Sequence, residues 1–256
     1  MKPSLTTSLA LAALAVFSVA AEATPAINGV YSTFKNGDGG WVGRIGPNGT
    51  GVTFIEPSLG DRKPSYRTQY DDFLKNGLRW YNDGKRWTGD YSVVPSFTFG
   101  VDVDALKVQE GQGYTTRDLM VYFLDYQHPP KGYDSISVGV KIGTLQMGLG
   151  WQHLTVTIPD TTSLELPDGW VGTGATDADG NPMLPKGRTF AEVMSHVDEI
   201  AIQTVRQPNV LVLDDFDVAI DNPYVAAACP NAGAKFSLEK APLAPAAQGS
   251  PFKPCE

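Results

Sequence analysis

The chain has 256 residues, of which 19% are charged, with a formal net charge of −8 and a pI near 4.9. Because binding to nucleic-acid phosphates needs a basic patch, this acidic balance excludes nucleic acid as a partner. The 27 glycines and 19 prolines indicate many turns rather than long helices.

The first 23 residues have the layout of a cleavable export signal: Lys2, an apolar run from Leu9 to Ala21, and small residues at Ala21 and Ala23. The run is too short and too alanine-rich for a membrane span, which needs about 20 apolar residues. We therefore expect a secreted or periplasmic protein with a signal peptide (1–23), one β-sandwich domain (24–225) and a Pro/Ala-rich tail (226–256), and no membrane span.

Several segments alternate apolar and polar residues with the period of a β-strand, namely 97–103, 136–142 and 154–158. The segment 119–126 is apolar on both phases, which is typical of a central strand buried on both faces. Turn-rich pieces separate these segments, so the sequence predicts a mostly antiparallel β-protein. The stretch 107–117 is interpreted as an extra loop.

One short helix is predicted after Thr189. Thr189 and Glu192 have the spacing of a capping box, and the apolar residues that follow form one stripe. The fold class we expect is an all-β, antiparallel jelly-roll β-sandwich with one short helix and a disulfide-stapled C-terminal tail.

The order of six motifs resembles the laminin IV-type (laminin B) domain and, more loosely, the galactose-binding-like jelly rolls of bacterial carbohydrate-binding modules. The motifs are FKNGDGGW (34–41), WTGDYS (87–92), SFTFGVDV (96–103), GWQHLTVTIP (150–159), FAEVMSHVDEIAIQT (190–204) and VLDDFDVAI (212–220). The resemblance implies an extracellular module without catalysis, frequently with a structural calcium ion.

The last predicted strand places one carboxylate, Asp214, on the same face as its apolar residues. Burying an unpaired charge costs roughly several kcal/mol. Asp214 must therefore be hydrogen-bonded, paired, protonated or bound to a cation. Asp214 and Asp215 are candidate ligands of Ca²⁺, and the resemblance adds Asp38 from the turn after the first strand. The alternative is that Asp214 accepts backbone N–H groups.

Aromatic residues are the candidates for glycan binding, because sugar rings stack on exposed aromatic faces while polar groups fix their orientation. We predict ligand contacts from Trp80, Tyr81, Trp170 and Trp151. The alternative for each tryptophan is burial in the core of the sandwich.

No catalytic motif is present: the chain lacks a G-x-S-x-G elbow, an H-E-x-x-H pair and a glycine-rich phosphate loop. The three histidines, His128, His153 and His196, show no ligand spacing in the sequence. The sequence therefore favours a binding protein over an enzyme.

Only two cysteines occur, Cys229 and Cys255. In an oxidising compartment they are expected to form a disulfide that closes the tail.

Together these features predict a secreted, non-catalytic module that binds a glycan or another envelope or matrix component, with a structural calcium ion. The alternatives are a purely structural or adhesive envelope protein, and a polysaccharide-active enzyme.

Overall fold

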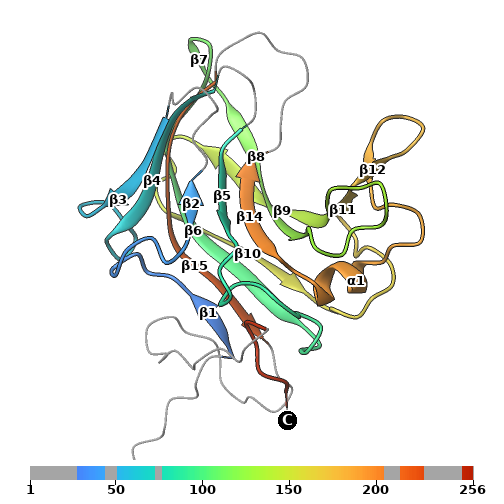
Figure 1. The fold of residues 1–256 in the computed structure, drawn as a ribbon. Coiled ribbons are helices and arrows are strands. Elements are labelled where there is room, and N and C mark those ends of the chain that lie inside the picture. The colour runs from blue at the N-terminus through green and yellow to red at the C-terminus, as the bar shows by residue number, and fades with distance from the viewer. Residues whose placement is uncertain (1–27, 44–50, 73–76, 205–213, 228–249, 256) are drawn as a thin grey trace, which may run out of the picture.

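In a computed structural model the chain forms two facing antiparallel sheets (Figure 1). The structure describes residues 28–43, 51–72, 77–204, 214–227 and 250–255. The predicted signal peptide and Cys229 lie outside these residues. Among them, no helix is long and apolar enough to cross a bilayer.

The first sheet has seven strands within the described residues. Its order is β10 (Gln152–Ile158), β6 (Phe97–Glu110), β15 (Asp214–Ala227), β4 (Ser65–Asp72) and β3 (Gly51–Glu56), with β1 (Gly29–Tyr31) paired to β15 and β7 (Gly113–Tyr114) paired to β6.

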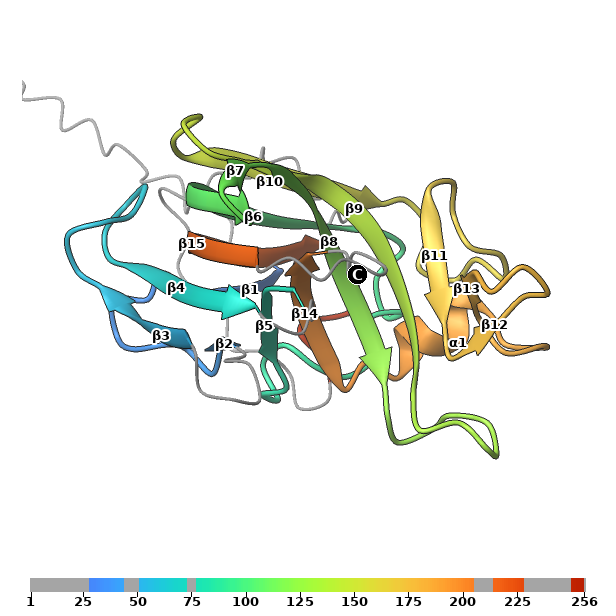
Figure 2. The same ribbon diagram turned by 90° about the horizontal axis from the view of Figure 1, so that it is seen from above.

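The second sheet has six described strands, and a small hairpin stands beside it. The six-stranded order is β11 (Trp170–Thr173), β9 (Ile136–Gln146), β8 (Thr116–Asp125), β14 (Glu199–Thr204), β5 (Arg79–Asn82) and β2 (Val42–Gly43). The hairpin pairs β12 (Ala175–Thr176) with β13 (Pro182–Met183). It gathers with β11 and the helix at one end of the molecule (Figure 2).

The apolar faces of both sheets meet in one core, as the period-two alternation predicts. The predicted strands 97–103, 136–142 and 154–158 lie in β6, β9 and β10, and segment 119–126 forms most of the central strand β8. The antiparallel β-sandwich class is thereby confirmed.

The helix α1 (Phe190–Ser195) is capped as predicted. The Thr189 side chain accepts the backbone N–H of Glu192, and the Glu192 side chain accepts the backbone N–H of Thr189. Phe190 is buried beneath the helix, where it meets the Trp170 ring edge to face at 5.0 Å. The helix therefore covers one end of the core.

The stretch 107–117 is not a loop, so that interpretation was wrong. Its first residues continue β6, Gln109 pairs with Tyr114 of β7, and β8 begins at Thr116. The segment is a β-hairpin in which β6 pairs with β7.

The end of the chain also enters the domain, which the composition of the tail did not predict. Phe252 is 1% exposed and contacts the rings of Tyr91 and Phe97 at 5.2 and 5.3 Å. The side chain of Asn28 holds this segment by donating to the carbonyl of Lys253 and accepting its N–H. The tail thus supplies a core residue.

Candidate ligand-binding face

The outer face of the six-stranded sheet carries one continuous row of residues, one from each strand. In cross-strand order the row consists of Val42, Tyr81, Ala201, Tyr122, Gly139 and Val171. Residues directly opposite each other on neighbouring antiparallel strands point to the same side. Two tyrosines therefore flank Ala201, and with strands about 4.8 Å apart their Cα atoms are roughly 10 Å apart.

Small residues form the floor beneath these rings. A Cβ added to Gly139 would lie 2.4 Å from the Tyr122 ring, so the ring lies flat on the glycine. Ala201 is fully buried although its side chain points outward. Tyr81 and Tyr122 are partly exposed, so part of each ring remains accessible on this face.

Polar groups surround the two rings. The Tyr122 hydroxyl hydrogen-bonds Gln203, and burial raises the pKa of Tyr122. The guanidinium of Arg79 lies 5.2 Å from the centre of the Tyr81 ring. Aromatic faces with fixed polar groups at their edges have the chemistry needed to bind an amphipathic ring such as a sugar.

A third tyrosine, Tyr126, follows β8 on the same phase and is 39% exposed. Its hydroxyl interacts with Glu199, which also forms an ion pair with Arg79. Burial raises the pKa of the Glu199 carboxyl, while Tyr126 and Arg79 favour its ionised form. Arg79 is therefore held against both Glu199 and Tyr81.

Of the residues predicted to bind ligand, Tyr81 is part of this face, but Trp80 and Trp170 are not. Trp80 is fully buried, and its indole N–H donates to Thr68 Oγ1 at 2.8 Å. Trp170 is 9% exposed and packs on Phe190. Both tryptophans occupy the inward phase of β5 and β11, so the structure places their rings in the core and not on this face.

Trp151 lies elsewhere, in a pocket of about 340 Å³ beside the seven-stranded sheet. Next to it, His153 Nδ1 lies 2.6 Å from Asp102 Oδ1, and the other oxygen of Asp102 accepts the side-chain N–H of Asn222 at 2.8 Å. The structure does not bring Trp151 together with Tyr81. A ligand contact at Trp151 stays a prediction.

Tyr122 was missed because the segment 119–126 was read as apolar on both phases. The signal lay in the alternation itself, since Tyr122 occupies the phase opposite Val121 and Phe123, which are fully buried. The segment alone does not show that Gly139 of β9 lies opposite Tyr122.

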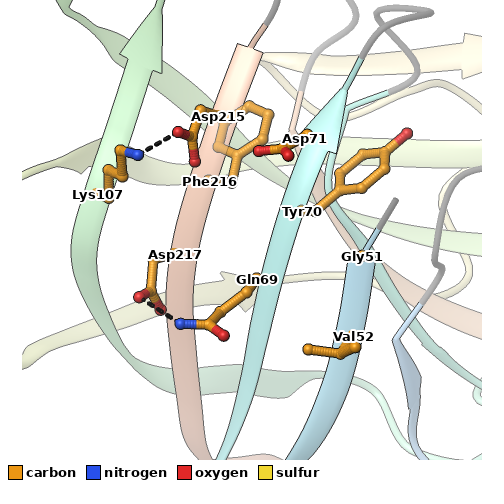
Figure 3. A pocket seen from close by; sticks show the side chains of 9 residues that line it. All are labelled: Gly51, Val52, Gln69, Tyr70, Asp71, Lys107, Asp215, Phe216 and Asp217. Carbon is orange, nitrogen blue, oxygen red and sulfur yellow. Dashed lines mark hydrogen bonds and ion pairs between the residues drawn. The ribbon is translucent and has the colours of Figure 1, made fainter. Parts of the chain in front are cut away.

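A larger pocket of about 500 Å³ lies on the outer face of the seven-stranded sheet (Figure 3). Two of its carboxylates, Asp215 and Asp217, are matched with polar side chains. Asp215 forms an ion pair with Lys107, and Asp217 accepts hydrogen bonds from Arg67 and Gln69. These pairs compensate the charges of Asp215 and Asp217.

The buried carboxylate predicted in the last strand is present, and its partner is a cation side chain. Asp214 is 3% exposed and accepts from Arg117 at 2.8 Å. Asp215 faces the opposite side of β15, and Asp38 accepts the backbone N–H of Gly40 in the turn after β1. The structure therefore does not bring the three predicted calcium ligands together, and calcium binding stays an untested prediction.

No cysteine among the described residues is free. Cys255 packs against the core, whereas Cys229 lies outside the described part, so their pairing stays a prediction.

Comparisons with known proteins place the chain near several solved structures. No protein-family model and no curated protein sequence matches it. A family 11 carbohydrate-binding module of the cellulosomal cellulase Lic26A-Cel5E of Clostridium thermocellum is similar, with 12% identity and a TM-score of 0.47 over 80% of this chain and 97% of that one.

Two longer chains are also similar. One is the CBM22-1-GH10 part of the C. thermocellum xylanase 10B, with 12% identity and a TM-score of 0.43 over 83% of this chain and 30% of that one. The other is an exo-β-agarase, with 12% identity and a TM-score of 0.48 over 79% and 25%. The present chain thus spans about a third or less of either protein.

Proposed function

We propose that the protein is a non-catalytic module that binds a glycan chain on the outer face of the six-stranded sheet. The observation that supports this proposal is the row in which Tyr81 and Tyr122 flank Ala201. Two partly exposed rings at this separation offer two stacking surfaces for one extended ligand.

The charges on the face suit a neutral or weakly charged ligand. Arg79 and Glu199 neutralise each other, and Lys141, which lies opposite Met120 in the neighbouring row, forms an ion pair with Asp118 at 2.6 Å. Hydroxyl-rich ligands need such edge groups as hydrogen-bond partners rather than a strong field of one sign.

The proposal is tested by measuring binding to a panel of soluble polysaccharides by affinity electrophoresis, followed by calorimetry with oligosaccharides of the best binder. Tyr122→Ala should weaken binding about 30-fold, because truncating an anchoring aromatic costs about 2 kcal/mol or more. Tyr114→Ala is the control, since Tyr114 is 66% exposed but lies on β7 of the other sheet.

A second pair of variants moves a ring without removing it. Gly139→Ala should displace the Tyr122 ring and weaken binding, whereas Gly100→Ala should displace the Tyr224 ring of the other sheet and leave binding unchanged. The two added methyl groups face equally close rings, at 2.4 and 2.3 Å, so the strain is matched. Equal effects of the two variants, or no binding to any polysaccharide, would favour the alternative of a structural envelope protein.

A further inference from the structure

Two of the three histidines meet beside a buried carboxylate at the end of β8. Asp125 ends the strand, His128 follows three residues later, and His196 ends helix α1. One ligand atom from each of the three side chains lies within 4.8 Å of the others. The centres of the two imidazole rings are 4.3 Å apart.

The loop that carries His128 is held in place by two carboxylates. Asp125 Oδ1 accepts the backbone N–H groups of Gln127 and His128, at 3.1 and 2.8 Å. Asp198 Oδ2 accepts the N–H groups of Tyr126 and Gln127, at 2.8 and 3.0 Å. These hydrogen bonds hold the backbone of the loop that carries His128 in place without a bound ligand.

Asp198 also connects the loop to the segment that carries His196. It lies two residues after His196, and its backbone N–H donates to the carbonyl of Leu124 at 2.8 Å. Both ends of the cluster are therefore tied to the same strand, β8, which lowers the conformational cost of bringing the imidazoles together.

The hydrogen bonds of His196 leave one nitrogen able to bind a cation. Its Nδ1 lies 2.9 Å from the hydroxyl oxygen of Ser195 and 3.1 Å from the carbonyl oxygen of Glu192. The Ser195 hydroxyl donates to the same carbonyl, so its oxygen can accept from Nδ1. With Nδ1 assigned as the donor to these two oxygens, Nε2 keeps its lone pair. Histidines that bind metals are commonly oriented by such a bond from the second ring nitrogen.

The separations approach those of a metal site. In tetrahedral geometry, Zn–N bonds of about 2.0–2.1 Å place ligand atoms about 3.3 Å apart. His128 Nδ1 lies 3.4 Å from Asp125 Oδ1. Asp125 is 2% exposed, whereas the His128 side chain is 54% exposed. The His128 imidazole therefore has room to rotate and bring the ligand atoms closer together, and solvent can reach the site.

We infer that Asp125, His128 and His196 form a binding site for a divalent transition-metal ion of the Zn²⁺ type. Two imidazole nitrogens and one carboxylate oxygen suit Zn²⁺, Cu²⁺ or Ni²⁺, whereas Ca²⁺ and Mg²⁺ prefer all-oxygen sites. With three protein ligands, at least one position is left for water or another molecule. The inference does not rest on the proposed glycan binding.

The test is a titration of metal-free, full-length protein without a histidine tag, using ZnCl₂ in calorimetry and Co²⁺ in visible absorption spectroscopy. Wild type should bind one equivalent of Zn²⁺ and give a Co²⁺ spectrum of low-coordinate nitrogen and oxygen ligands. His128→Gln and His196→Gln should each weaken binding by about tenfold or more. Excess Ca²⁺ or Mg²⁺ should not compete.

The third histidine provides the matched control. His153 lies on the other sheet and contacts Asp102, so His153→Gln should bind Zn²⁺ as wild type does. Circular dichroism checks that all three variants fold, and glutamine at these exposed positions should not unfold the domain. Absence of stoichiometric binding in wild type, or equal affinity in His128→Gln, His196→Gln and wild type, would overturn the site.

Discussion

Arg117 donates to Asp214 across the interior of the sandwich at 2.8 Å, and the side chain of each residue is only 4% exposed. Arg117 also reaches Glu110 at 3.2 Å. The carboxylate that the last strand turns inward is therefore compensated by a guanidinium. Because both charges are removed from water, removing either one should strongly destabilise the folded state.

Asp214→Asn should lower the free energy of unfolding by about 3 kcal/mol, because it removes the buried partner of Arg117 and leaves only the more exposed Glu110 beside that charge. Urea denaturation measures this loss. The matched control is Asp215→Asn, which breaks the more exposed pair with Lys107 and should cost at most about 1 kcal/mol. If instead EDTA lowers the midpoint of wild type and leaves Asp214→Asn unaffected, a cation at Asp214 is the correct account.

Phe252→Ala should destabilise the domain by about 3–5 kcal/mol, because it removes a buried ring that contacts Tyr91 and Phe97. Lys253→Ala is the control, since the side chain of Lys253 is exposed and its backbone bonds to Asn28 are kept. The measurement is the urea midpoint of each variant. A protein shortened before residue 250 that keeps the wild-type midpoint would contradict the role of the tail in the core.

The cysteine prediction is checked by thiol labelling. Under denaturing, non-reducing conditions the exported protein should show no reactive thiol, because Cys229 and Cys255 are its only cysteines. Reduction should cost roughly 3–4 kcal/mol on the chain-entropy model. Two labelled thiols per chain in the unreduced protein would show that the pair does not form.

Asp221 should make stability depend on pH. It is fully buried, and burial raises the pKa of its carboxyl from 3.8 to about 6 although Arg62 and Asn222 donate backbone N–H groups to it. The folded state favours the protonated form, so this contribution to stability is complete below about pH 4 and is lost as the pH rises through about 6.

The measurement compares the unfolding free energy of wild type and Asp221→Asn across that range. Wild type should lose up to about 3 kcal/mol relative to the variant as the pH rises, whatever constant offset the substitution adds. Asp160→Asn is the control of opposite sign. Hydrogen bonds from Thr162 lower the pKa of Asp160, so its contribution to stability is lost as the pH falls. A difference between wild type and Asp221→Asn that does not change with pH would refute the shift.

The proposed binding face and the proposed metal site could not be predicted from the sequence, although their parts were visible. Tyr122 alternates with buried residues, but only the strand register places Gly139 beneath its ring and Ala201 beside it. The spacing of Asp125 and His128 is local, whereas His196 joins them only because α1 ends beside β8. Contacts of this kind depend on residues far apart along the chain.

The features that depend on neighbouring residues follow from the sequence alone. Alternation along β6, β9 and β10 follows from the pleat of a strand, the capping box at Thr189 follows from a four-residue spacing, and the inward position of Asp214 follows from the same period of two. That Arg117 is the cation paired with Asp214, and that Trp80 is buried, follow only from the tertiary structure. A period of two separates the faces of a strand, but only the packing of one sheet against the other decides which face water reaches.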